Sequence, residues 1–187
     1  MIVRLQDIPN IITLLRLLIV VPLLYLLWIE EFGWALALFA LAGVSDALDG
    51  FLAKHFGWTS WLGGILDPLA DKVLLVASFL ILGALGLIPL WLVIAAILRD
   101  LIIVGGALVY HLLVEDIDAA PLLASKVNTL FQILLVITVI ANAGPLPLPG
   151  VLIQFLIYAC LASIIASGAQ YVYLWSRKAT RKPWRQP

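Results

Sequence analysis

The sequence is poor in charge, in cysteine and in basic patches, and each shortage excludes a class of protein. Of the 187 residues 12% are charged, whereas a soluble domain carries about 25%. The single cysteine, Cys160, excludes an intramolecular disulfide, and we interpret it as a small apolar residue packed within a helix. Lysine and arginine together number 11, as do aspartate and glutamate. The net charge of zero does not bear on nucleic acid, but the sequence shows no basic face with interleaved aromatics, so we expect no nucleic acid as a partner.

What the sequence has in abundance is apolar residues, which make up 64% of the chain. The mean hydropathy is +1.15, so we predict an integral membrane protein. A spanning helix needs about 20 apolar residues, and the breaks between such runs are marked mostly by proline and glycine. We predict an all-α bundle of six transmembrane helices in one domain, residues 1–187, with a short amphipathic lead at 1–8 and a basic tail at 177–187. The predicted spans are 9–29, 34–55, 61–86, 89–113, 122–142 and 150–176.

The distribution of cations predicts the orientation of these helices. With six spans, Arg4, Lys54, Lys126 and the basic tail all fall on one side of the membrane. The connections on the other side contain no lysine or arginine. Because positive residues collect in cytoplasmic loops, we expect both termini in the cytoplasm. The basic tail is either a solvated anchor or a contact for anionic lipids.

Four aspartates interrupt the second and third apolar segments. Asp46 and Asp49 are three residues apart near the end of the second segment, and Asp67 and Asp71 are four apart near the start of the third. Either spacing places both carboxylates of a pair on one helix face, and consecutive spans are antiparallel, so the pairs can meet at one depth. Charged residues inside spans are costly and usually functional.

Four neighbouring carboxylates require cations, since they would otherwise repel one another strongly in a low dielectric. Oxygen ligands without accompanying histidine favour hard ions, Mg²⁺ or Mn²⁺. Four carboxylates sharing two ions form a two-metal site, which clamps a transferring phosphoryl group. Two alternatives stay open here: ion pairs with intramembrane lysine or arginine, and a cation or proton pathway of a non-enzymatic carrier.

Glycines flank both acidic pairs. Gly50 follows Asp49 directly, and Gly63 precedes Asp67 by four residues. Glycine allows a ligand or a backbone to come close, so a groove for a nucleotide or a headgroup is one interpretation. Close packing of helices on small residues is the other.

The signature D-x-x-D-G-x-x-A-K, followed after eight residues by G-x-x-x-D-x-x-x-D, resembles that of the CDP-alcohol phosphotransferases. The resemblance implies a six-helix membrane enzyme that transfers a phosphatidyl or similar group from a CDP-linked donor to an alcohol and releases CMP. It also implies a homodimer. The matching residues are Asp46, Asp49, Gly50, Ala53, Gly63, Asp67 and Asp71.

The resemblance also implies roles for these residues. The four aspartates would hold the metal ions, and Asp71 would be the base for the acceptor hydroxyl. Gly50, Ala53 and Gly63 would border the donor's cytidine. Lys54 stands where the family usually has arginine; it keeps the charge but lacks the two-pronged donor geometry. An inactive family member is therefore a further alternative.

Stretches outside the signature resemble the branch that makes phosphatidylglycerophosphate or cardiolipin. By that resemblance Arg16, Arg99 and Lys126 would form a cationic pocket for an acceptor phosphate. The other interpretation of these cations is neutralisation of Asp100 or of the aspartate cluster. Asp100 and Asn128 are closer to the cardiolipin synthases than to the glycerol-phosphate enzymes. We therefore expect CDP-diacylglycerol as donor and phosphatidylglycerol as acceptor, with glycerol 3-phosphate as the alternative, in the inner or plasma membrane of a bacterium.

Overall fold

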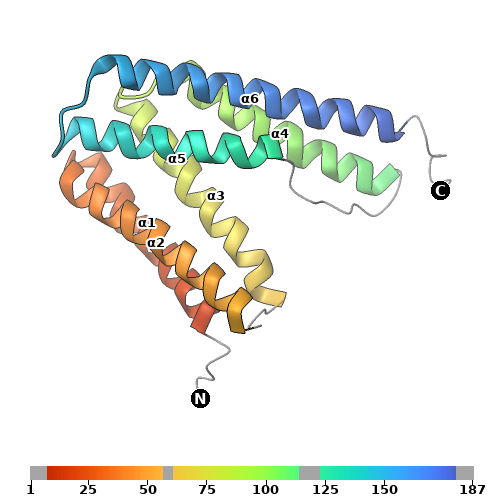
Figure 1. Cartoon of the computed structure of the whole chain (residues 1–187), viewed down its shortest axis with the longest axis horizontal. Helices are drawn as coiled ribbons and strands as arrows, with labels where there is room; N and C mark the ends of the chain where they lie inside the picture. The colour runs from red at the N-terminus through yellow and green to blue at the C-terminus, as the bar shows by residue number, and fades with distance from the viewer. Residues whose placement is uncertain (1–7, 57–60, 114–122, 180–187) are drawn as a thin grey trace. The chain divides into compact units, whose positions relative to one another are not determined.

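The computed structural model describes residues 8–56, 61–113 and 123–179, and every regular element in these ranges is a helix. Within them, some side chains lie outside the description, namely those of residues 8–10, 49, 52–54, 56, 61–68, 108–113, 175, 178 and 179. The helices are α1 (Ile8–Trp28), α2 (Phe32–Phe56), α3 (Trp61–Ala84), α4 (Leu90–Leu113), α5 (Leu123–Ala143) and α6 (Gly150–Ala179) (Figure 1). The prediction of six helices is confirmed, with boundaries within a few residues of those expected.

Four of these helices have the length and apolar composition to cross a membrane. The qualifying stretches are Ile11–Trp28, Leu90–Ala107, Leu123–Ala143 and Gly150–Leu174. In α2 the apolar stretch Phe32–Leu48 is shorter, and it already contains Asp46. The described side chains of α3 include Asp71 and Lys72. Six membrane crossings and the placement of the termini therefore stay predictions, because the signature's charges interrupt the two helices concerned.

The chain divides into two compact units. The first contains residues 1–87 and 136–148, and the second contains residues 88–135 and 149–187. In the first unit α1 packs against both α2 and α3; in the second α4 packs against α6. The last turns of α5 belong to the first unit and the rest of α5 to the second.

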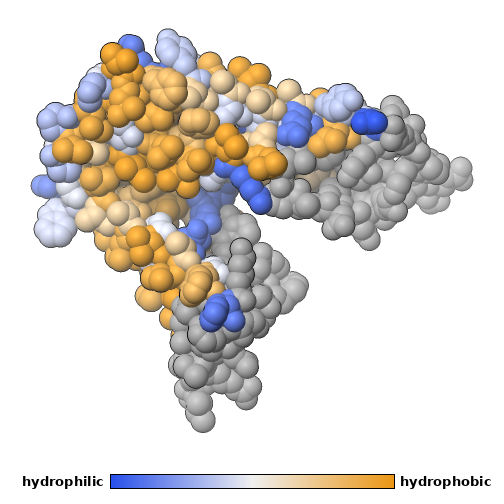
Figure 2. Space-filling view, viewed as in Figure 1, coloured by the Kyte–Doolittle hydropathy of each residue, from blue (hydrophilic) through white to orange (hydrophobic). Residues whose placement is uncertain are grey.

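Helix α1 shows why the first unit assembles. Arg16, Val20, Leu23 and Leu27 are all buried, and their spacing of three or four residues forms one stripe along the helix. The opposite face is also apolar, with Leu18 and five similar residues exposed: Leu14, Leu15, Val21, Tyr25 and Trp28. A helix that is apolar on both faces is typical of one side packed on protein and the other on lipid. Hydrophobic residues likewise cover most of the described surface in Figure 2.

Two helices of the first unit end in the same backbone arrangement. After α3, the Gly86 N–H donates to the Gly83 carbonyl and the Leu87 N–H to the Leu82 carbonyl, the hydrogen bonds of a Schellman cap. Gly86 has a φ of 72°, in the left-handed region. Glu30 occupies the equivalent position after α1, with a φ of 61°. These caps end the helices and turn the chain into the short connections that follow.

Candidate functional site

The first unit brings two of the four signature aspartates to one atom. Arg16 Nη1 lies 2.8 Å from Asp46 Oδ1 and 2.5 Å from Asp71 Oδ1. The Arg16 side chain is 0% exposed, whereas each of the two carboxylates is 46% exposed. A buried guanidinium from α1 thus supports two accessible carboxylates, one from α2 and one from α3.

The positions of these residues along their helices explain the meeting. Arg16 lies eight residues after the start of α1, Asp46 ten residues before the end of α2, and Asp71 ten residues after the start of α3. At about 1.5 Å per residue, each is roughly 12–15 Å from its helix end. Because the chain reverses direction from one helix to the next, these ends belong to the same side of the unit. The antiparallel arrangement expected for the two acidic pairs therefore brings Asp46 and Asp71 together.

Several predicted site residues lie outside the described side chains. Asp49, Ala53 and Lys54 belong to α2, and Gly63 and Asp67 to α3. Their backbones are part of the described helices, and the roles of their side chains stay predictions.

Gly50, on α2, adjoins open space. A Cβ atom built on this glycine meets no atom of the described residues within 4 Å. Close helix packing, the other interpretation of this glycine, would require a neighbour at that distance. Gly43 of the same helix has equally open surroundings among the described residues, so the space at Gly50 admits a ligand without by itself indicating one.

The chemistry of this cluster fits a hard divalent cation. Asp46 and Asp71 direct oxygens at one positively charged nitrogen, so the space between them already favours positive charge. Each carboxylate has two oxygens and about four lone-pair sites, so a bond to Arg16 leaves capacity for a metal. Among the described side chains no group of three or more histidine, cysteine, aspartate or glutamate residues could by itself hold a metal. Two of the four predicted metal ligands, Asp49 and Asp67, lie outside the described side chains.

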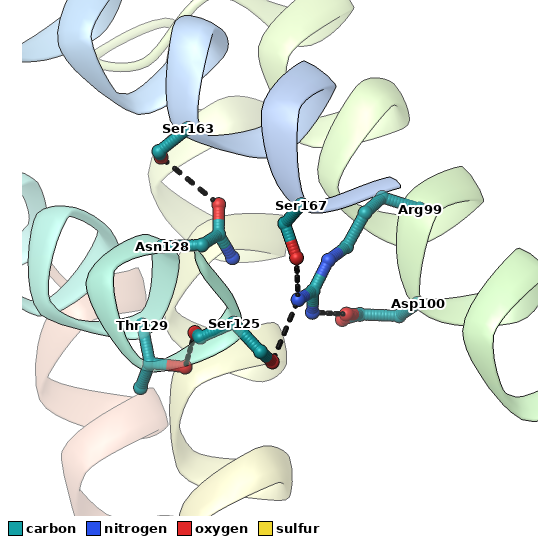
Figure 3. Close-up of polar contacts among 7 residues, drawn as sticks. All are labelled: Arg99, Asp100, Ser125, Asn128, Thr129, Ser163 and Ser167. Carbon is teal, nitrogen blue, oxygen red and sulfur yellow. Dashed lines mark hydrogen bonds and ion pairs between the residues drawn. The ribbon is translucent and has the colours of Figure 1, made fainter. Parts of the chain in front are cut away.

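The second unit holds a separate polar network around Arg99 of α4 (Figure 3). Arg99 Nη1 donates to Asp100 Oδ1 at 2.8 Å, and Nη2 donates to Ser125 Oγ of α5 at 2.8 Å and to Ser167 Oγ of α6. Arg99 is 5% exposed and Ser167 is 0% exposed. The Nε atom of Arg99 is buried and has no hydrogen-bond partner among the described residues. Arg99 thus joins three helices, and its ion pair with Asp100 matches the neutralising role that the sequence left open.

Asn128 of α5 is buried in the same unit. Its Oδ1 accepts a hydrogen bond from Ser163 Oγ of α6 at 3.1 Å, and its Nδ2 has no partner among the described residues. Ser163 and Ser167 were missed as candidate site residues. Their spacing of four residues on an otherwise apolar helix was a signal that could have found them.

Lys126 of α5 presents an exposed side chain. It belongs to the second unit together with Arg99, whereas Arg16 belongs to the first. A shared acceptor pocket for the three cations therefore stays a prediction.

Comparison with known proteins points to one family. A family model described as CDP-alcohol phosphatidyltransferase matches residues 6–175, which span both compact units. The chain is 34% identical over 190 residues to the cardiolipin synthase (CMP-forming) of Rattus norvegicus, covering 93% of this chain and 63% of the rat protein. It is 39% identical over 116 residues to the protein of the same name from Streptomyces coelicolor, covering 58% of this chain and 54% of that protein.

A relative with a different printed name is also similar. The chain is 30% identical over 178 residues to a probable phosphatidylglycerophosphate synthase of Mycobacterium tuberculosis, covering 90% of this chain and 81% of that protein. The chain thus spans less than two thirds of the length of the two cardiolipin synthases above and most of the length of this one.

Proposed function

The chain belongs to the CDP-alcohol phosphatidyltransferase family, and from this premise we propose that it transfers a phosphatidyl group from CDP-diacylglycerol to phosphatidylglycerol. The products are cardiolipin and CMP. The names of the rat and Streptomyces relatives support this acceptor. The observation that carries the proposal is the convergence of Asp46 and Asp71, both accessible, on Arg16 within the part of the chain that the family model matches.

The reaction exchanges the phosphoanhydride bond of the donor's pyrophosphate for a phosphoester bond to the acceptor. The acceptor hydroxyl oxygen forms a bond to the phosphorus that carries diacylglycerol, and the bond from that phosphorus to the bridging pyrophosphate oxygen breaks. CMP leaves with that oxygen, and the hydroxyl proton passes to a base. We assign this base to Asp71, whose half-exposed carboxylate is open to a substrate; it acts when the hydroxyl is within hydrogen-bond reach.

Enzymes of this family use divalent metal ions. We propose two ions, Mg²⁺ or Mn²⁺, held by Asp46, Asp49, Asp67 and Asp71. When bound, they supply positive charge to the pyrophosphate and to the departing CMP. Gly50 leaves open space beside the acidic pair of α2, and we assign Gly50, Ala53, Gly63 and Lys54 to donor binding.

The acceptor's phosphate needs a cation of its own. Exposed Lys126 and the buried Arg99 network, both in the second unit, are the candidates. Because Asp100 already offsets part of the charge of Arg99, this set suits the single charge of a phosphodiester better than the double charge of a phosphomonoester. This favours phosphatidylglycerol over glycerol 3-phosphate.

Phosphatidylglycerophosphate synthesis is the second candidate function. The Mycobacterium tuberculosis relative that bears that name is matched over 81% of its length. In this reaction glycerol 3-phosphate replaces phosphatidylglycerol as acceptor and the donor is unchanged. Cation transport without a nucleotide is a weaker candidate, because the family match spans most of the chain.

The molecular setting follows the same proposal. We propose six crossings of the inner membrane of a bacterium, with both termini and the active site on the cytoplasmic side, and a homodimer as the working assembly. The four qualifying apolar helices support a membrane protein, and the cation distribution supports the orientation.

The test is CMP release from the purified protein in detergent with CDP-diacylglycerol and Mg²⁺ or Mn²⁺. Phosphatidylglycerol and glycerol 3-phosphate are supplied in separate reactions. Asp71→Asn removes the proposed base, and Glu31→Gln makes the same chemical change in the connection after α1, where the side chain is exposed. We expect CMP release with phosphatidylglycerol. The rate should fall by at least a hundredfold in Asp71→Asn, because a general base contributes about 10²–10⁴ to the rate. Glu31→Gln should keep the wild-type rate.

Each alternative gives a different result. CMP release with glycerol 3-phosphate alone would show that the protein carries out the second candidate function, phosphatidylglycerophosphate synthesis. No release with either acceptor, under either metal, would reject both transferase proposals and leave an inactive family member or a carrier.

A further inference from the structure

Arg16 lies beneath the carboxylates and not beside them. Its side chain is fully buried, whereas Asp46 and Asp71 are each 46% exposed. One nitrogen of Arg16 serves both aspartates, at 2.8 Å and 2.5 Å. The guanidinium is therefore on the protein side of the cluster, and the carboxylates are on its accessible side.

This placement is unsuited to an acceptor phosphate. A phosphate would have to compete with the two signature carboxylates that Arg16 already contacts, whereas Arg99 pairs with one carboxylate, that of Asp100. Lys126, by contrast, is exposed. We therefore favour for Arg16 the other interpretation, neutralisation of the aspartate cluster, because both carboxylates that it contacts belong to the signature.

We propose that Arg16 is a positioning residue of the metal site, which holds Asp46 of α2 and Asp71 of α3 at a common point before a metal arrives. Two carboxylates brought together in a low dielectric repel each other, and a buried cation between them offsets that repulsion. Both helices pack on α1, the helix that carries Arg16, so their carboxylates are aligned through one rigid element. The inference rests on the proposed metal site but not on the identity of the acceptor.

Partners behind a ligand usually orient it and raise its affinity for the metal. Loss of such a partner typically lowers metal affinity by 10–100-fold. The opposite effect is also physically possible, because removing a positive charge near a dication reduces repulsion. The sign of the change in metal affinity therefore distinguishes a positioning residue from a residue that only occupies the cluster as a counter-ion.

The experiment titrates Mn²⁺ into the purified, metal-stripped protein without substrates and follows bound Mn²⁺ by electron paramagnetic resonance. Arg16→Gln removes the charge, and Arg16→Lys keeps it. We expect the apparent Kd for Mn²⁺ to rise by about 10–100-fold in Arg16→Gln and by less in Arg16→Lys, whose ammonium keeps the charge but not the planar fork. Arg99→Gln is the matched control, a buried arginine of the second unit, and should leave the apparent Kd for Mn²⁺ unchanged.

Steady-state kinetics of the same variants complete the assignment. In Arg16→Lys the metal concentration for half-maximal rate should rise while the acceptor KM stays within about twofold. In Arg99→Gln the acceptor KM should rise instead. If Arg16→Gln does not fold, Arg16→Lys carries the measurement by itself.

Several results would overturn the proposal. An unchanged or tighter Mn²⁺ affinity in the Arg16 variants would make the residue a counter-ion only. A raised acceptor KM with unchanged metal dependence would return Arg16 to the acceptor pocket. The experiment distinguishes failure of this proposal from failure of the proposed function. Mn²⁺ binding that depends on Arg16, without any CMP release, would reject the transferase activity and leave the positioning role of Arg16 intact.

Discussion

At the scale of single residues, the first unit places a buried cation behind two accessible carboxylates. Asp46 and Asp71 are accessible, Arg16 behind them is buried, and Gly50 adjoins open space. The aspartate–glycine signature in the sequence predicted Asp46, Asp71 and Gly50 as functional residues. The burial of Arg16 depends on how α1 packs, which the sequence pattern around it does not specify.

Gly50 provides a test of ligand approach that is independent of the metal. Gly50→Ala adds a methyl group in open space on a helix, which by propensity stabilises by about 0.5–1 kcal/mol. We nevertheless expect the KM for CDP-diacylglycerol to rise by about tenfold, equivalent to ~1.4 kcal/mol, because the methyl group occupies space that the donor uses. The measurement combines a thermal melt with donor kinetics.

The control is Gly43→Ala in the same helix, where an added Cβ also meets no described atom within 4 Å. It should give the helix gain without the change in donor KM. Equal donor KM values for wild type and Gly50→Ala would remove Gly50 from the donor site.

Asn128 offers a second test at this scale. It is 0% exposed and its amide nitrogen has no partner among the described residues, which is an expensive arrangement for a group without a function. The one Ser163 hydroxyl proton is shared between Asn128 Oδ1 and the Cys160 carbonyl, so when Asn128 is replaced the hydroxyl still donates to the carbonyl. We expect Asn128→Leu to change the free energy of unfolding by less than about 1 kcal/mol, while the acceptor KM rises severalfold.

The measurement is a denaturation midpoint together with acceptor kinetics, with Ser163→Ala as the matched change on the other side of the hydrogen bond. Ser163→Ala should affect the acceptor KM less than Asn128→Leu does. A large loss of stability with an unchanged KM would make Asn128 a structural residue only.

At the scale of helices, the boundaries could be predicted because apolar length and proline or glycine punctuation set them locally. The caps were less accessible to prediction. Gly86 after α3 has the left-handed φ that glycine adopts freely, but Glu30 has the same conformation after α1, and nothing in the residue type indicates it. The cap is set there by the hydrogen bonds from the Glu30 and Glu31 N–H groups to the carbonyls of Leu27 and Leu26.

The two caps form a matched pair for mutation. A non-glycine residue in the left-handed region costs roughly 1–2 kcal/mol. Gly86→Ala should therefore lower the free energy of unfolding by about 1 kcal/mol, and Glu30→Gly should raise it by up to a similar amount. Thermal melts in one detergent measure both. Opposite signs are the expected result, and a destabilising Glu30→Gly would show that its side chain contributes more than its backbone strain costs.

At the scale of the whole molecule, the outward faces of the helices are apolar enough for lipid (Figure 2), but the orientation in the membrane rests on the cation distribution. The only cysteine, Cys160, is buried, so the natural chain should not react with a membrane-impermeant maleimide. Single substitutions Glu31→Cys and Pro145→Cys, in two connections, and Arg177→Cys, at the end of α6, then report the side of the membrane.

With six crossings and cytoplasmic termini, Glu31→Cys and Pro145→Cys label in intact cells. Arg177→Cys labels only after the cells are opened, and the unsubstituted chain is the control. Labelling of Glu31→Cys and Arg177→Cys from the same side would contradict the proposed orientation, because these positions are separated by five of the six proposed crossings.

The sequence by itself determined the membrane class, the six helices and the family, since apolar run length and the aspartate–glycine signature are local patterns that need no three-dimensional information. It also determined that Asp46 and Asp71 could meet, because helical spacing and alternating direction are geometric consequences of chain order. Only the tertiary structure decided which cation lies under the carboxylates. Arg16 is distant in sequence from both aspartates. Whether it can bind a substrate or instead positions the metal-binding carboxylates depends on how the helices pack around it. In the same way, packing of α4 with α6 placed Ser167 against Arg99, a partnership between residues that no local pattern connects.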